Sequence, residues 1–94
     1  MGTYLMFGKY APESIGKISA ERTKQGTKVI GDCGGQVKAG YAMLGEKDLL
    51  VIVDFPGTKE AMKASVALAK LLGIAITTAP AVSMEEFDKL VAGA

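Results

Sequence analysis

The sequence predicts a single α+β domain over residues 1–94, with the element order β-α-β-β-α-β and a short C-terminal helix. Three observations lead to this prediction. Segments with the alternation of strands are interleaved with segments that have helical spacing. Glycine and proline separate these segments. Finally, 94 residues with 49% hydrophobic and 22% charged side chains are typical of one small globular domain.

The first strand is predicted over residues 3–10, where strand-forming side chains dominate. Pro12 and Glu13 suit the first turn of a helix, because proline gives up no needed hydrogen bond there and an acid meets the positive end of the helix dipole. Glycine weakens this helix, so we expect a break over residues 16–19, and the pair Gly34-Gly35 ends it. The inward stripe of this helix consists of Ile15, Ile18, Arg22, Gly26, Val29 and Cys33.

A β-hairpin is predicted next, with strands at 36–44 and 48–55 on either side of a turn at 45–47. The turn is short and contains Gly45, which favours close antiparallel pairing of the two strands. Pro56 then stops the second strand.

A second helix is predicted from Thr58, a good N-cap, to Leu72, with Gly73 as its C-cap. The last strand is expected over residues 74–79, and Pro80 is expected to close it. A short final helix is indicated by Ser83 and Glu86, which have the spacing of a capping box. Its apolar face consists of Met84, Phe87, Leu90 and Val91.

The third strand is apolar on both faces, which indicates that both faces are covered. Two helices joined by right-handed crossovers pack on the same side of the sheet, so the other face is left bare. We expect Leu50, Ile52, Met6 and Tyr41 on that face. A contiguous apolar patch of this kind is unusual on a monomer. The sequence therefore predicts a homodimer, or an assembly of dimers, that packs through its sheets; the alternative is that the final helix covers part of this face.

The composition excludes several kinds of chemistry. The chain has no histidine and one cysteine, so His-ligated haem, most zinc sites and any Ser-His or Cys-His pair are not expected. We predict no metal and no cofactor. A net charge of +1 gives no basic footprint for nucleic acid, and no apolar run is long enough to cross a membrane. The N-terminal residues lack the pattern of a signal peptide, and the free thiol of Cys33 favours a cytoplasmic location.

Two charged residues are candidates for a functional role. Arg22 lies within the inward stripe of the first helix and can bind a carboxylate or phosphate through two parallel hydrogen bonds. The favoured alternative is a structural ion pair with Asp54, Asp48 or a glutamate, or a side chain that extends along the edge of the helix to keep its charge in water. Asp54 follows the apolar part of the third strand and is a weak candidate for a general base. The favoured alternative for Asp54 is a structural role in capping the turn that follows it.

Three tyrosines complete the candidate set. We expect Tyr4, Tyr10 and Tyr41 to share one face of the sheet, where their hydroxyls could orient a ligand beside an apolar cavity. The favoured alternative is that they lie in the interface between two copies, because tyrosine is enriched in interfaces. Cys33 is predicted to be an inert residue at the end of the first helix.

Several segments resemble the GYD domain family. These segments run from Tyr4 to Tyr10, from Ile18 to Thr23, from Val53 to Ser65, from Thr77 to Val82 and from Glu85 to Phe87. The similarity covers nearly the whole chain. It implies a ferredoxin-like antiparallel sheet with helices on one face, in the group of dimeric α/β barrels. The Gly-Tyr-Asp signature that names the family is replaced by Gly45-Glu46-Lys47-Asp48, so Lys47 stands where a tyrosine is expected.

The resemblance implies a fold but no reaction. Proteins with this fold include cofactor-independent monooxygenases, muconolactone-isomerase-like enzymes and small-molecule sensing domains, and the fold alone does not choose among them. Our leading hypothesis is a homo-oligomeric module that binds a small organic ligand, such as an organic acid, or that mediates interactions. The rival hypothesis is a cofactor-independent enzyme that uses Asp54 and tyrosine hydroxyls for proton transfer.

Overall fold

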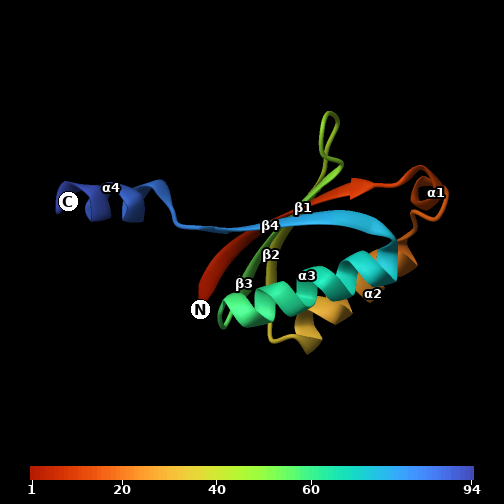
Figure 1. Cartoon of the computed structure of the whole chain (residues 1–94), viewed down its shortest axis with the longest axis horizontal. Coiled ribbons are helices and arrows are strands. Elements are labelled where there is room, and N and C mark those ends of the chain that lie inside the picture. The colour runs from red at the N-terminus through yellow and green to blue at the C-terminus, as the bar shows by residue number, and fades with distance from the viewer.

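The computed structural model describes all of residues 1–94 as a four-stranded sheet with two long helices against it (Figure 1). The strands are ordered β2-β3-β1-β4, and all neighbouring pairs are antiparallel. The elements are β1 (Gly2–Tyr10), α1 (Pro12–Ile15), α2 (Ala20–Asp32), β2 (Gln36–Ala42), β3 (Leu49–Phe55), α3 (Thr58–Leu72), β4 (Ile74–Ala81) and α4 (Met84–Ala92).

Helices α2 and α3 lie side by side on one face of the sheet, and the opposite face is uncovered (Figure 1). This arrangement confirms the predicted α+β, ferredoxin-like fold. The first helix is broken where the glycine pattern predicted: α1 ends at Ile15, and α2 begins only after Ser19, whose side chain accepts a hydrogen bond from the backbone N–H of Arg22. The break allows α2 to start with its own N-cap.

The register between β1 and β3 decides which side chains enter the core. Met6 pairs with Val51 and Tyr4 pairs with Val53. Directly paired residues point to the same face, so Met6 belongs to the helix-covered face, where it is only 2% exposed. The expectation that Met6 lies on the bare face with Leu50 and Ile52 is therefore wrong. Leu5 and Phe7 occupy that face instead, opposite Ile52 and Leu50.

The core is built around Phe55, Val53 and Met6, which are buried almost completely between the sheet and α3. Alanines at positions 61 and 64 of α3 are also buried, and their small side chains allow the helix to approach the sheet closely. The ring of Tyr4 meets the ring of Phe55 edge to face, with centroids 5.7 Å apart. The tightest packing is thus under α3, at the end of the sheet where β3 finishes.

Several predicted element ends differ from the structure; for example, β2 ends at Ala42 and not at residue 44. Gly57 is the N-cap of α3, and the hydroxyl of Thr58 is instead hydrogen-bonded to the hydroxyl of Tyr4 at 3.1 Å. Strand β4 does not stop at Pro80 but continues to Ala81, with Pro80 paired to Tyr4. A proline is tolerated there because β4 is an edge strand, so its missing N–H can face away from the sheet.

Helix α4 stands apart from the rest of the molecule. It continues beyond the end of β4, away from the sheet and from α3 (Figure 1). The radius of gyration is 14.2 Å and the longest dimension is 49 Å, whereas a compact domain of this length has a radius of gyration of about 12 Å. The alternative in which the final helix covers the bare face of its own sheet is therefore not the arrangement observed.

Candidate functional site: a cavity under helix α2

A cavity of about 390 Å³ lies between α2 and the helix-covered face of the sheet. This volume is within the range of about 300–1,000 Å³ that is usual for small-molecule sites. Most of the side chains around it are apolar. The wall is formed by Met6, Gly8, Tyr10, Ser14, Ile18, Ser19, Arg22, Thr23, Gly26, Thr27, Ile30, Val37, Gly40, Tyr41, Ala42, Leu49, Val51, Leu68, Leu72, Ile74 and Ile76.

Several of the residues with which α2 lines the cavity are small. Thr23, Gly26 and Thr27 recur at helical spacing and all line the cavity. None of them is long enough to fill the space above the sheet. Ile30, one turn further on, is 3% exposed and closes the cavity at the end near α3 and β3. A run of small residues at the inward positions of a helix is the sequence signal that could have identified this site.

Arg22 is the only charged side chain that lines the cavity. Its Nη2 donates a hydrogen bond to the backbone carbonyl of Leu71 at 3.2 Å, which ties the N-terminal part of α2 to the end of α3. No carboxylate lies within 4 Å of the guanidinium, and every ion pair in the chain is formed by a lysine. The predicted structural ion pair of Arg22 is therefore wrong, and its remaining N–H donors are free to bind an anion.

Further polar groups surround the same space. Ser14 is buried, and its hydroxyl donates to the carbonyl of Gly73 at 2.6 Å, so its oxygen retains acceptor capacity. Thr23 and Thr27 each donate a hydrogen bond to a backbone carbonyl one turn earlier in the helix. Tyr10 lines the cavity from the end of β1, and its backbone N–H donates to Asp48 at 2.8 Å. Apart from Arg22, the polar contacts that the cavity offers are neutral.

Asp54 lies on the opposite face of the sheet from the cavity. It pairs with Thr3 of β1 and with Gln36 of β2. Its carboxylate accepts a hydrogen bond from the hydroxyl of Thr3 at 2.8 Å and forms an ion pair with Lys38 at 3.7 Å. These contacts hold neighbouring strands together, so the structure places Asp54 as a cross-strand partner and not beside the cavity or as a cap of the following turn.

The three candidate tyrosines do not come together. Tyr4 and Tyr10 are on the helix-covered face but six positions apart along β1, which corresponds to about 20 Å. Tyr4 is packed under α3 and does not line the cavity, whereas Tyr10 does. Tyr41 borders the cavity from the edge strand β2 but pairs with Leu50, which places it on the opposite face. Of the three tyrosines, only Tyr10 both lines the cavity and lies on the helix-covered face, so it is the best candidate to contact a ligand.

The chain contains no group of three or more side chains placed to hold a metal ion. Cys33 is a free, half-buried thiol at the C-terminal end of α2. No helix is both long enough and apolar enough to span a lipid bilayer. The candidate site consists of the cavity, Arg22 and neutral hydroxyl groups.

Solved structures of transcriptional regulators are among those that share this α+β fold. One is the leucine response regulatory protein of Mycobacterium tuberculosis, with a TM-score of 0.58 and 6% sequence identity over 88% of this chain and 51% of that chain. Another is an AsnC family transcriptional regulator from Agrobacterium tumefaciens, with a TM-score of 0.58 and 20% identity over 87% of this chain and 50% of that chain. This chain thus spans about half the length of each regulator, and the likeness concerns the fold alone.

The sequence profile of the GYD domain matches residues 4–91. The match begins within β1, includes the other three strands and both long helices, and ends within α4, so the chain belongs to the GYD domain family. The search of curated proteins finds no match.

Proposed function

We propose that this chain is a homo-oligomeric module that binds a small organic acid in the cavity under α2, as a binding protein and not as an enzyme. A single observation carries this proposal. Arg22 is the only charged residue of a mostly apolar cavity, and it has no carboxylate partner in the chain. A ligand with an anionic group and an apolar body would match both features of this cavity.

The position of Arg22 also suits this ligand. Arg22 lies in the first turn of α2, between the N-cap Ser19 and Thr23, where the positive end of the helix dipole favours a negative charge. The deep end of the cavity is closed by apolar side chains of Met6, Leu68 and Ile74, each at most 5% exposed. The anionic group of a ligand would therefore bind near Arg22, with its apolar part directed toward the sheet.

Self-association is the second part of the proposal. The uncovered face of the sheet carries Leu5, Phe7, Leu50 and Ile52, which form two direct cross-strand pairs between β1 and β3. These side chains are half-buried in one chain. Packing of a second copy against them would remove a contiguous apolar surface from water, which favours association.

The rival hypothesis of a cofactor-independent enzyme gains no support from the geometry. A general base has to be within hydrogen-bond reach of the proton that it removes. Asp54 is on the other face of the sheet, and no carboxylate lines the cavity. The ligand-binding hypothesis requires only the groups that the cavity presents.

The proposal can be tested by measuring melting temperatures in the presence of acetate, benzoate, octanoate and inorganic phosphate. A ligand that binds only the folded state raises the melting temperature by mass action. We expect benzoate or octanoate to raise it by several degrees, and acetate to raise it less because it lacks an apolar body. The Arg22→Met variant should lose this response.

Lys24→Met is the matched control, because it removes one positive charge from the same helix at an exposed position that does not line the cavity. It should respond to the acids like the unmodified chain. Arg22→Lys should give a smaller response, because lysine keeps the charge but loses the planar pair of donors. An equal response in Arg22→Met and Lys24→Met, or no response in the unmodified chain, would refute the proposed role of Arg22.

A further inference from the structure

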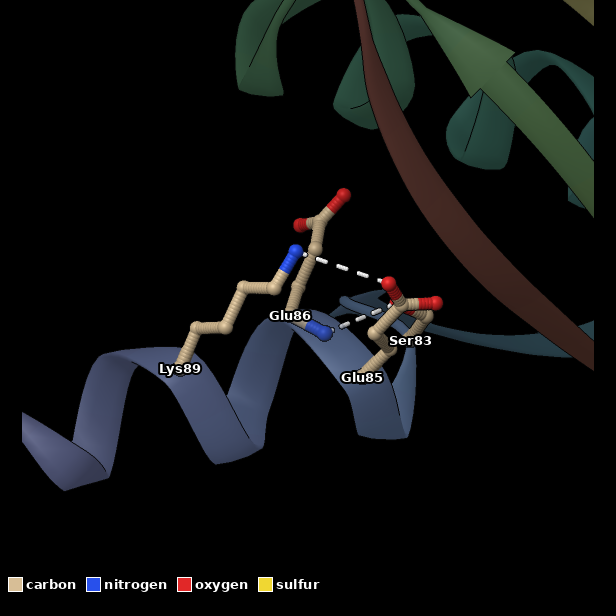
Figure 2. Close-up of polar contacts among 4 residues, drawn as sticks. All are labelled: Ser83, Glu85, Glu86 and Lys89. Atoms are coloured by element: carbon tan, nitrogen blue, oxygen red, sulfur yellow. Dashed lines mark hydrogen bonds and ion pairs between the residues drawn. The ribbon is translucent and has the colours of Figure 1, made fainter.

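Helix α4 has an apolar face that nothing in its own chain covers. Met84, Phe87, Leu90 and Val91 lie on this face and are 47% to 72% exposed. The hydroxyl of Ser83 caps the helix by accepting a hydrogen bond from the backbone N–H of Glu86 at 3.1 Å (Figure 2). A helix of this length is marginal in water without packing against a partner. The formed helix with its exposed apolar face therefore indicates a docking element.

The charges of α4 are arranged around that face. Glu85 and Lys89 lie on the opposite side of the helix and form an ion pair with each other at 3.4 Å (Figure 2). With 3.6 residues per turn, Glu86 and Asp88 fall on the two borders of the apolar face. Neither of these two acids has a cationic partner in the chain. The surface that α4 offers is an apolar strip bordered by unpaired negative charge.

A groove of matching character lies between α3 and the edge strand β4. It has a volume of about 260 Å³, and Met62 and Val66 of α3 border it with 63% and 55% of their surface exposed. A hydrogen bond of 2.6 Å between the hydroxyls of Ser65 and Thr78 joins the two elements beside it. The groove is open and mostly apolar, and Ile76 is the one residue that lines both this groove and the cavity under α2.

Positive charge lies beside this groove on the exposed side of α3, although no lysine lines the groove itself. Lys59, Lys63 and Lys70 are exposed on α3 and fall, at helical spacing, next to Met62 and Val66. None of the three lysines has a carboxylate partner in the chain. The groove thus presents an apolar strip with unpaired positive charge beside it, which is the electrostatic complement of α4.

We propose that α4 of one chain docks into the groove between α3 and β4 of a second copy, with Phe87 in the groove and Glu86 or Asp88 facing the lysines of α3. A second copy is favoured over the same chain by the connection from β4. Only Val82 and Ser83 join β4 to α4, and Ser83 is in an extended conformation with φ −65° and ψ 157°. This connection directs α4 away from its own α3, as Figure 1 shows.

The test uses two charge-reversal variants of the full chain. In the first, Lys59→Glu is combined with Lys63→Glu; in the second, Glu86→Lys is combined with Asp88→Lys. Sedimentation velocity over a concentration series measures the association of each variant alone and of an equimolar mixture. Each variant alone should associate at least about tenfold more weakly than the unmodified chain, because attraction between the two surfaces becomes repulsion. The mixture should regain the association, because a basic α4 then meets an acidic groove and an acidic α4 meets a basic groove.

Glu85→Lys is the control for the helix, because it makes one Glu-to-Lys change in the first turn of α4 but on the side away from the apolar face. It should associate like the unmodified chain. Phe87→Ala should weaken association at least about tenfold, since large apolar side chains in pockets dominate interface energy. The control Leu44→Ala removes a fully exposed side chain of the β2–β3 turn and should have no effect.

Three results would overturn the proposal. The first is that the mixture does not regain association, whereas a single chain that carries all four substitutions does. This would show that α4 covers its own groove. The second is unchanged association of both charge-reversal variants and of Phe87→Ala, which would leave α4 without this partner. The third is an equal loss in Glu85→Lys, which would show a cost to the helix itself instead of a lost contact. Circular dichroism of each variant establishes that its fold is intact.

Discussion

The guanidinium of Arg22 donates a hydrogen bond to the backbone carbonyl of Leu71 at 3.2 Å, across the contact between α2 and α3. This contact orients the side chain but leaves its positive charge without a negative partner in the chain. An arginine held by a carbonyl can bind an incoming anion without first breaking an ion pair. The proposed anion site therefore depends on this hydrogen bond between Arg22 and Leu71, which orients the guanidinium without neutralising its charge.

The stability of Arg22→Met follows from this geometry. Loss of a buried ion pair would cost about 3–5 kcal/mol, but Arg22 has no such pair to lose. Loss of one hydrogen bond at a half-buried position should cost about 1 kcal/mol or less. Urea denaturation in the absence of added acids measures the difference. A loss above about 3 kcal/mol would contradict the arrangement and indicate a hidden structural role for Arg22.

Asp54→Asn tests whether the carboxylate on the open face matters for ligand binding. The substitution removes the ion pair with Lys38, whose side chain is 51% exposed, and leaves an acceptor for the hydroxyl of Thr3. An ion pair with this exposure contributes under about 1 kcal/mol, so urea denaturation should show a small loss. The response of the melting temperature to benzoate should be unchanged. Loss of that response with retained stability would instead support a functional role for Asp54.

Gly35→Ala should destabilise the chain through crowding. A Cβ atom at this position would lie 2.5 Å from Cε1 of Phe55 and 2.7 Å from Cγ2 of Ile30. Both neighbours are core side chains, so they cannot move away freely, and overpacking of this kind costs about 1–3 kcal/mol. The change in the free energy of unfolding in urea measures this cost directly.

Gly26→Ala is the control for that experiment. Here an added Cβ atom would make only ordinary contacts, 3.5 Å from Cδ2 of Leu68 and 3.7 Å from Cδ1 of Leu72. Alanine also favours a helix interior over glycine by about 0.5–1 kcal/mol, so this variant should be more stable than the unmodified chain. A destabilised Gly26→Ala together with a neutral Gly35→Ala would contradict the packing described between α2, α3 and the sheet.

The fold was predictable from the sequence because its signals are local. The break before Ser19, the β-hairpin around Gly45 and the start of α4 after Ser83 each depend on residues within one turn of the chain. Periodicity identified every strand and helix for the same reason. Pro80 is one exception: it was expected to end the last strand, but β4 continues through it because β4 lies at the edge of the sheet.

The candidate site was harder to predict because it depends on how elements pair. The alternation within β1 separates Met6 from Leu5 but does not say which of them faces the helices; the pairing of Met6 with Val51 decides that. The missing partner of Arg22 likewise depends on the position of α2 relative to each carboxylate. Sequence reasoning therefore found Arg22 as a candidate but assigned it the wrong structural partner.

The open face of the sheet provides the last prediction, which concerns Ile52. This residue pairs with Leu5 and lies in the middle of β3, on the face that the helices leave uncovered. If a second copy packs against this face, Ile52→Lys places a charge in an apolar contact, and burying an unpaired charge is costly. We expect at least about a tenfold weaker association in sedimentation velocity. Ile52→Thr should give a smaller loss, because threonine keeps the β-branched shape that favours a strand.

Gln36→Lys is the matched control for this face, because Gln36 pairs with Asp54 on the same side of the sheet but at the exposed margin of the edge strand β2. A lysine there can remain in water, so association should be unchanged. Near-ultraviolet circular dichroism distinguishes weaker association of a folded chain from a failure to fold. Normal association of a folded Ile52→Lys chain would show that the apolar pairs of β1 and β3 are not an interface, and the contact made by α4 would then have to account for any self-association.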